Sequence, residues 1–180
     1  MAHDDRGDES GIDESTSIVS GRTTDAERLI ARLGELGWTI GVAESLTGGL
    51  LCAALVEVPG ASAYVRGGVV AYATDLKKTL LGVDGAILDL DGPVQPKVAR
   101  QMADGARDVL GAAGGRADVG VSTTGIAGPA SPDGQPVGTV YVGVSTPLGT
   151  RVELLQLSGT RDEIRTETVR RALRLTLEAL

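Results

Sequence analysis

The sequence has almost no histidine and almost no cysteine, and these two absences limit the chemistry available to the chain. Its one histidine is His3, and its one cysteine is Cys52. A single cysteine excludes an internal disulfide and a cysteine-rich metal site, and one histidine argues against a zinc or ferrous enzyme. Cys52 lies in an apolar helical run, which favours a buried hydrophobic role over a nucleophilic one. A magnesium site made of carboxylates alone stays open.

Aromatic residues and long apolar runs are also scarce. The chain of 180 residues has one Trp, three Tyr and no Phe, so its core must be built from aliphatic side chains. No apolar segment approaches 18 residues, and the N-terminus has no signal-peptide pattern, so we expect no membrane association and a cytoplasmic location. The net charge is −7 with scattered basic residues, which argues against nucleic acid as a partner.

The chain divides into a short polar tail and one domain. Residues 1–22 are acidic and rich in Ser, Asp and Gly, and we predict a disordered tail there. From residue 23 to residue 180 the pattern predicts one α/β domain with three layers, α/β/α, around a mixed, mostly parallel central sheet. Capping boxes at Thr24-x-x-Glu27 and Thr160-x-x-Glu163 mark the first and last helices of this domain.

The expected elements follow from apolar periodicity, β-branched runs, glycine and proline. Helices are predicted from Thr24 to Gly37 and over 47–57, 75–81, 96–110 and from Thr160 onward. Strands are predicted over 38–43, 65–73, 117–122, 137–145 and 151–157, the last two as an antiparallel hairpin.

The segment Ala43-Glu-Ser-Leu-Thr-Gly-Gly49 is the strongest functional signal in the sequence. It connects a strand to a helix, so it would present the Ser45 hydroxyl beside unpaired helical amides, a suitable place for an anion or an oxyanion. A serine before a helix is also a common cap, but Thr47 is better placed to cap this helix. Glu44 is equally well interpreted as a structural or an orienting carboxylate.

Polar side chains collect at three predicted strand exits. Glu44, Ser45 and Thr47 follow the first strand, and Ser122, Thr123, Thr124 and Gly125 follow the third. The second exit carries Tyr72, Thr74, Asp75 and Lys77. If these strands are parallel neighbours, the three exits line one edge of the sheet, where open α/β sheets bind ligands.

Lysine is a candidate to replace the missing histidine as a base. The chain has three lysines against fourteen arginines, and arginine stays protonated. Lys77 lies one turn past the second exit, within reach of Ser45, and Tyr72 ends that strand, which together suit a Ser–Lys hydrolase assisted by a tyrosine. The alternative is that Lys77 is a solvated helix lysine and Tyr72 a packed strand residue.

Two further segments are candidates for ligand contact. Thr123-Thr-Gly-Ile-Ala-Gly-Pro129 contains glycines that allow a ligand to approach the backbone, although a plain loop fits it nearly as well. Arg161 lies in the first turn of the last helix, where an acidic residue is electrostatically preferred. This placement suggests an anion contact, and a solvated side chain is the alternative.

These segments resemble the CinA C-terminal domain family, whose stand-alone members include nicotinamide-nucleotide amidases. The matching stretches are VAESLTGGLLCAALVEVPGAS, GGVVAYATDLKKTLLGV, GVSTTGIAGP, PVGTVYVGV and SGTRDEIR. The resemblance implies hydrolysis of nicotinamide mononucleotide to nicotinic acid mononucleotide and ammonia. It implies Ser45 as the nucleophile, Lys77 as its base and Tyr72 as a supporting hydroxyl, with no metal or cofactor.

The same resemblance places the nucleotide among Thr47, Gly48, Gly49 and the loop of Thr124, Gly125 and Ile126, and it implies a homodimer. With Glu44 and Arg161, these residues complete the expected substrate site. Leu46, Gln95 and Ala130–Asp133 depart from the family pattern. The last two departures motivate an alternative, a non-catalytic nucleotide-binding or interaction module of the same fold. A third possibility is an amidase acting on another pyridine or ribonucleotide amide.

Overall fold

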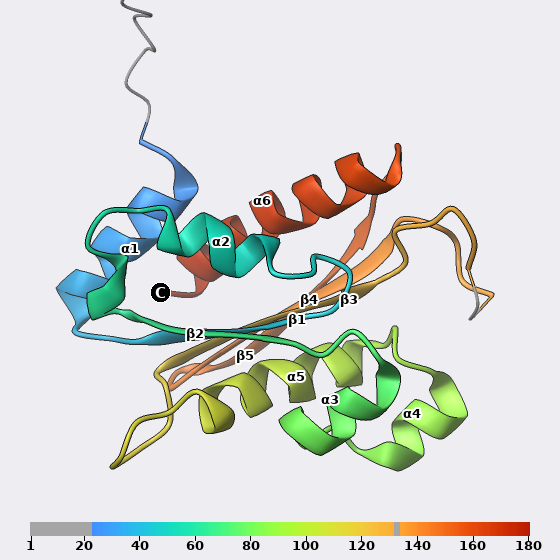
Figure 1. Ribbon diagram of the computed structural model, residues 1–180, viewed down its shortest axis with the longest axis horizontal. Coiled ribbons are helices and arrows are strands. Elements are labelled where there is room, and N and C mark those ends of the chain that lie inside the picture. Colours follow the sequence, from blue (N-terminus) through green and yellow to red (C-terminus); the bar gives the residue numbers. More distant parts are fainter. Residues whose placement is uncertain (1–22, 132–133) are drawn as a thin grey trace, which may run out of the picture.

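A computed structural model describes residues 23–131 and 134–180, and the predicted disordered tail, 1–22, lies outside the described residues. Within these described residues, five strands form one sheet with helices on both sides (Figure 1). The strands are β1 (Ile40–Glu44), β2 (Val65–Val70), β3 (Val119–Gly125), β4 (Thr139–Thr146) and β5 (Gly149–Gln156). The helices are α1 (Asp25–Leu36), α2 (Leu50–Val56), α3 (Thr74–Leu81), α4 (Gly85–Asp91), α5 (Pro96–Val109) and α6 (Arg161–Ala179), with a 3₁₀ turn η1 (Ala61–Ala63).

The sheet is mixed, with strand order β2-β1-β3-β4-β5. The strands β2, β1 and β3 are parallel neighbours, and β4 pairs antiparallel with both β3 and β5. Four strands therefore run in one direction and only β4 runs in the other, which confirms the predicted mixed, mostly parallel sheet. The carboxyl ends of the three parallel strands meet at one edge, as the site hypothesis requires.

The helices form two outer layers, which confirms the three-layer prediction. The helices α1, α2 and α6 cover one face of the sheet, and α3, α4 and α5 cover the other (Figure 1). The chain changes face as it passes from α2 through β2 to α3, because β2 and β3 flank β1 on opposite sides. This change of face at β1 creates the crevice in which open α/β sheets bind ligands.

The core is aliphatic and divides between the two faces of the sheet. Leu29, Leu33, Leu55 and Ile164 belong to the larger cluster, which α1, α2 and α6 form with the sheet. Val98, Met102, Leu81 and Leu88 belong to the smaller one, from α3, α4 and α5. No helix within the described residues is long and apolar enough to span a membrane.

The helix caps of α1 and α6 follow the sequence signals closely. Thr24 and Glu27 form the predicted capping box of α1, and Thr160 and Glu163 form that of α6. The helix α3 ends at Gly82 in a left-handed conformation that suits glycine.

The start of α2 differs from the prediction. The helix begins at Leu50, three residues later than expected, and its N-cap is Gly49, whose φ of 100° requires glycine. The expectation that Thr47 caps this helix is wrong, because the Thr47 hydroxyl lies 2.7 Å from the Thr123 hydroxyl instead. The helix α4 was not predicted at all, because its seven residues are too few to show a periodicity.

Candidate active site

The three predicted strand exits surround a cavity of about 390 Å³ at the carboxyl edge of β1, β2 and β3. Its wall consists of six polar or charged side chains and eight small or apolar residues: Ser45, Leu46, Tyr72, Thr74, Lys77, Pro93, Val94, Thr124, Gly125, Ile126, Ala127, Gly128, Ala130 and Arg161. Seven of the predicted site residues are brought together here: Ser45, Tyr72, Lys77, Thr124, Gly125, Ile126 and Arg161.

Ser45 and Lys77 are in contact in the wall of this cavity. Ser45 follows β1 directly and is 8% exposed, and its amide donates to the Thr123 carbonyl, which extends the pairing of β1 with β3. Lys77 projects from α3 and is 1% exposed. Its Nζ atom lies 3.1 Å from the Ser45 Oγ atom, a hydrogen-bond distance between two buried side chains. The solvated alternative for Lys77 is therefore wrong.

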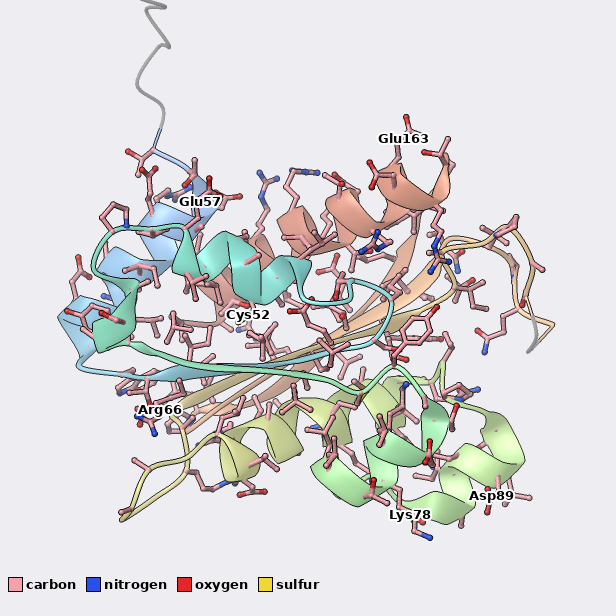
Figure 2. All side chains as sticks on the ribbon, in the orientation of Figure 1. Cys52, Glu57, Arg66, Lys78, Asp89 and Glu163 are labelled. Carbon is pink, nitrogen blue, oxygen red and sulfur yellow. The ribbon has the colours of Figure 1, made fainter. Side chains whose placement is uncertain are left out.

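Two main-chain carbonyls hold the Lys77 amine in place. Its Nζ donates to the Ala71 carbonyl at 2.8 Å and to the Tyr72 carbonyl at 3.4 Å. Both carbonyls lie in the connection between β2 and α3, so the segment that ends the strand also positions the lysine. The next residue, Lys78, is exposed and extends from α3 away from the sheet (Figure 2).

Tyr72 and Arg161 form a bridge across the mouth of the cavity. Tyr72 is 61% exposed, which overturns the alternative of a packed strand residue. Its hydroxyl accepts a hydrogen bond from Arg161 Nη2 at 3.2 Å, and Arg161 Nη1 donates to the Gly128 carbonyl at 2.7 Å. Tyr72 therefore lines the cavity, but its hydroxyl pairs with the arginine of α6.

Glu44 is a structural residue of the turn that carries Ser45, because its carboxylate is fully buried and accepts hydrogen bonds from the protein itself. It accepts hydrogen bonds from the amides of Gly49, Leu51 and Cys52 at 2.8–3.1 Å, and thereby supplies the negative charge that a helix N-terminus favours. The sequence predicts that amides at this helix start bind a ligand anion, but they donate to the Glu44 carboxylate instead.

Four predicted substrate-binding residues therefore do not line the cavity: Glu44, Thr47, Gly48 and Gly49. Gly48 donates its amide to the Ser45 carbonyl, so it closes the turn and does not face a ligand. Cys52 lies on α2 (Figure 2). Burial, and then the Glu44 carboxylate, raise the pKa of its thiol, which weakens it as a nucleophile.

Two residues of the apolar wall, Pro93 and Val94, are not among the site residues predicted from the sequence. Pro93 and Val94 come from the connection after α4, and the Thr124 hydroxyl donates to the Pro93 carbonyl at 2.8 Å. The prolines near the start of α5 indicate a break in regular structure there. No local signal in the sequence shows that this connection reaches the end of β3. Gln95 lies outside the cavity wall, and its side chain donates to the Asp91 carbonyl.

The cavity is cationic in a chain of net charge −7. Among the residues that the structure describes, the charged side chains of the wall are Lys77 and Arg161, and none is a carboxylate. Within the described ranges there is no cluster of three His, Cys, Asp or Glu side chains that suits a metal ion. A larger hollow of about 570 Å³ lies between α1 and α6, but basic and acidic side chains alternate along it and the Ser–Lys pair is elsewhere. We assign the site to the smaller cavity on chemical grounds.

The fold and the site together define an α/β protein with a mixed sheet and a buried serine–lysine pair at its carboxyl edge. The chain belongs to the CinA C-terminal domain family, whose model matches residues 22–180. A putative competence-damage inducible protein of Geobacillus sp. (strain WCH70) is 43% identical over 155 residues, covering 86% of this chain and 36% of that protein. A CinA-like protein of Frankia casuarinae is 46% identical over 142 residues, which are 79% of this chain and 32% of that one.

Solved structures show the same fold. A competence/damage inducible protein of Agrobacterium tumefaciens superposes with a TM-score of 0.79 at 38% identity, covering 86% of this chain and 92% of that one. A CinA superfamily protein of Escherichia coli gives 0.80 at 29% identity, with coverages of 87% and 91%. The chain spans about a third of the length of the curated relatives that it matches.

Proposed function

We propose that this chain is a metal-independent amidohydrolase that converts nicotinamide mononucleotide to nicotinic acid mononucleotide and ammonia. The observation that carries the proposal is the 3.1 Å contact between Lys77 Nζ and Ser45 Oγ in the cavity wall. Both side chains are buried, so bulk water has little access to either. A serine nucleophile needs an adjacent base, and Lys77 is the basic side chain in contact with it. Hydrolysis of a carboxamide by this pair requires no metal ion.

The surroundings of Lys77 suit a base that gains and then returns a proton. Three oxygens lie around its amine: the Ala71 carbonyl, the Tyr72 carbonyl and the Ser45 hydroxyl. In the neutral amine, two N–H groups donate to the carbonyls and the lone pair accepts the Ser45 proton. In the ammonium form, all three N–H groups have an acceptor. The site thus accommodates both protonation states of Lys77.

The reaction proceeds through an acyl-enzyme. Ser45 Oγ attacks the carboxamide carbon as its proton passes to Lys77, and the carbonyl becomes a tetrahedral oxyanion. The C–N bond then breaks, and the nitrogen leaves as ammonia with the proton from Lys77. Water adds to the ester carbon, loses a proton to Lys77, and releases the carboxylate product and the Ser45 hydroxyl.

The amides of Leu46 and Gly125 are the donors that we assign to the oxyanion. Both residues line the cavity, and within residues 23–131 and 134–180 the Leu46 amide, which lies outside the helices and strands, donates no hydrogen bond to another backbone group. The Ile126 amide donates to Thr139 on β4, and N–H groups alternate in direction along a strand, so the Gly125 amide faces the side on which Ser45 follows β1. The Gly48 amide donates to the Ser45 carbonyl, so it is not available to the oxyanion.

The rest of the cavity fits a nucleotide with an aromatic base. Leu46, Val94 and Ile126 give an apolar wall on which a pyridine ring can lie. Arg161, in the mouth, is the side chain suited to a phosphate group, since its guanidinium forms paired hydrogen bonds with phosphate oxygens. The competence-damage names of the relatives state no substrate, so the substrate is assigned from the cavity and from the family resemblance.

The test is ammonia release from a panel of amides: nicotinamide mononucleotide, nicotinamide riboside, free nicotinamide and a ribonucleotide carboxamide. We expect turnover of nicotinamide mononucleotide, with stoichiometric nicotinic acid mononucleotide, in the presence and absence of a chelator. Turnover of another amide with nicotinamide mononucleotide inert would assign a different amidase. Calorimetric binding of the nucleotide with no ammonia from any compound over hours would instead identify a non-catalytic binding module.

A further inference from the structure

Arg165 grips the turn that carries Ser45, although no part of Arg165 lines the cavity. It extends from α6 and donates from Nε to the Leu46 carbonyl at 2.9 Å and from Nη2 to the Thr47 carbonyl at 3.2 Å. These are the first two carbonyls after that of the nucleophile. The residues are 119 and 118 positions apart in the chain, so the contact is a tertiary one between the last helix and the first strand exit.

The geometry of this contact fixes the orientation of the turn. Carbonyl and N–H groups of a trans peptide point in opposite directions, so holding the Leu46 carbonyl toward α6 directs the Thr47 amide away from it. The Ser45 carbonyl is held by the Gly48 amide in the same way. The peptide groups on both sides of Leu46 are therefore fixed, and with them the Leu46 amide that we assign to the oxyanion.

A guanidinium is the side-chain group suited to this task. Its planar fork presents Nε and Nη2 in a fixed arrangement that matches two successive carbonyls, and hydrogen bonds from a charged donor are stronger than those between neutral groups. Arg161, one helical turn earlier on the same face of α6, reaches the cavity mouth instead. One helix thus supplies one arginine to the cavity and another to the turn behind it.

We propose that Arg165 is a positioning residue for catalysis, which holds the Leu46 and Thr47 carbonyls so that Ser45 Oγ stays in line with Lys77 and the Leu46 amide stays open to the oxyanion. The inference rests on the proposed amidohydrolase function for its kinetic consequence, whereas the grip on the turn is independent of any substrate. Arg165 acts on the chemical step through the turn and contributes nothing to nucleotide binding.

The test compares Arg165→Met and Arg165→Lys with the matched control Arg174→Met. Arg174 is an exposed arginine of the same helix, 3.6 Å from Asp25 of α1 and remote from the turn. We expect Arg165→Met to lower kcat by about 10- to 100-fold with KM within about 3-fold of wild type, since small displacements of reacting groups have effects of this size. The kcat of Arg165→Lys should lie between those of wild type and Arg165→Met. Added guanidinium ion should restore part of the kcat of Arg165→Met. The control Arg174→Met should have the kcat and KM of wild type.

Hydrogen–deuterium exchange of the peptide that spans residues 44–52 tests the grip without any substrate. Arg165→Met should speed exchange in this peptide relative to wild type and to Arg174→Met. Unchanged exchange would overturn the proposal whether or not the protein is an amidase, and a raised KM with unchanged kcat would overturn it in favour of a substrate contact. If wild type releases no ammonia from any amide, the proposed function fails, and faster exchange in Arg165→Met still supports the grip on the turn.

Discussion

At the scale of single residues, the proposed chemistry depends on a lysine whose burial costs desolvation free energy. Removing an ammonium group from water is unfavourable unless hydrogen bonds and charge compensate, so buried lysines are rare. Lys77 is nevertheless 1% exposed, and two carbonyls and a serine hydroxyl face its amine. A helix lysine with only a structural task needs no such arrangement, as exposed Lys78 beside it shows.

Replacing Lys77 with methionine should remove the proposed base while keeping most of the side-chain volume. We expect kcat of Lys77→Met to fall by roughly a thousandfold or more, because members of a catalytic unit contribute effects of this size. Ammonia release under saturating nicotinamide mononucleotide measures it, and Lys78→Met provides the matched control with near-native activity. If Lys77→Met kept a tenth of the native kcat, Lys77 would not be the base.

Measurement of kcat and KM can distinguish a binding role from a proton-transfer role for the Tyr72 hydroxyl. Its hydrogen bond to Arg161 predicts that Tyr72→Phe loosens Arg161 and raises KM by several-fold, with kcat within about 3-fold of wild type, as loss of uniform binding does. The family resemblance instead implies that the Tyr72 hydroxyl supports proton transfer. In that role, Tyr72→Phe would lower kcat and leave KM unchanged. Separate measurement of kcat and KM decides between the two, and a large loss of kcat at constant KM would remove Tyr72 from the binding role.

At the scale of elements, the sequence located the site because parallel strands end at the same edge. Ser45, Tyr72 and Thr124 were assigned to three strand exits, and the pairing of β1 with β2 and β3 brings these exits around one cavity. The role of Glu44 is harder to predict, because its position in the sequence allows a ligand contact or a structural role. Only the fold shows that its carboxylate accepts hydrogen bonds from three amides at the start of α2.

Pro93 and Val94 of the apolar wall are not predicted from the sequence, for a different physical reason. Pro93 and Val94 reach the cavity because α3 and α4 bring the chain back over the sheet before α5, and this path depends on packing between distant segments. Arg165 is similar, since its partners lie far away in the chain. Local patterns report periodicity and caps, whereas contacts of this kind exist only in the assembled fold.

The first turn of α6, which bears Arg161, should show a defined response to acid. The Thr160 backbone amide and then its hydroxyl lower the pKa of the Glu163 carboxyl below its usual 4.5 (Figure 2). A carboxyl whose pKa is lower in the folded state stabilises the fold above its unfolded pKa and loses this effect as pH falls through the folded value. The free energy of unfolding of Glu163→Gln should therefore fall below that of wild type at pH 7.

This deficit should shrink progressively as the pH is lowered below about 4.5. Denaturant unfolding at a series of pH values measures it, and Thr160→Ala, which removes the hydroxyl acceptor of the same box, provides a comparison. A deficit that stayed constant from pH 7 to pH 3 would show that the charge of Glu163 does not contribute through this capping box.

At the scale of the whole molecule, the site joins segments from both outer layers of the sheet. Ser45 follows a central strand, Lys77 comes from a helix on one face, and Arg161 comes from a helix on the other. A ligand that contacts all three links the two layers, so it should stabilise the whole domain and not a single loop. The cavity also concentrates positive charge in an otherwise acidic protein, which suits an anionic nucleotide.

Binding of the product should therefore raise the thermal midpoint. At 100 times its dissociation constant, a ligand specific for the folded state adds about 2.7 kcal/mol, which is roughly 5–10 °C for a domain of this size. Thermal unfolding with nicotinic acid mononucleotide measures the shift, and Arg161→Gln at the same ligand concentration should show a smaller one. An equal shift in both proteins would exclude Arg161 from nucleotide binding.

The central claim is that Ser45 attacks the carboxamide of nicotinamide mononucleotide with Lys77 as its base, and the most direct test is ammonia release by wild type and by Ser45→Ala at saturating substrate. We expect steady production of ammonia and nicotinic acid mononucleotide by wild type, and a rate lower by several orders of magnitude in Ser45→Ala. We also expect Ser45→Ala to bind the nucleotide. Near-native ammonia release by Ser45→Ala would show that Ser45 is not the nucleophile.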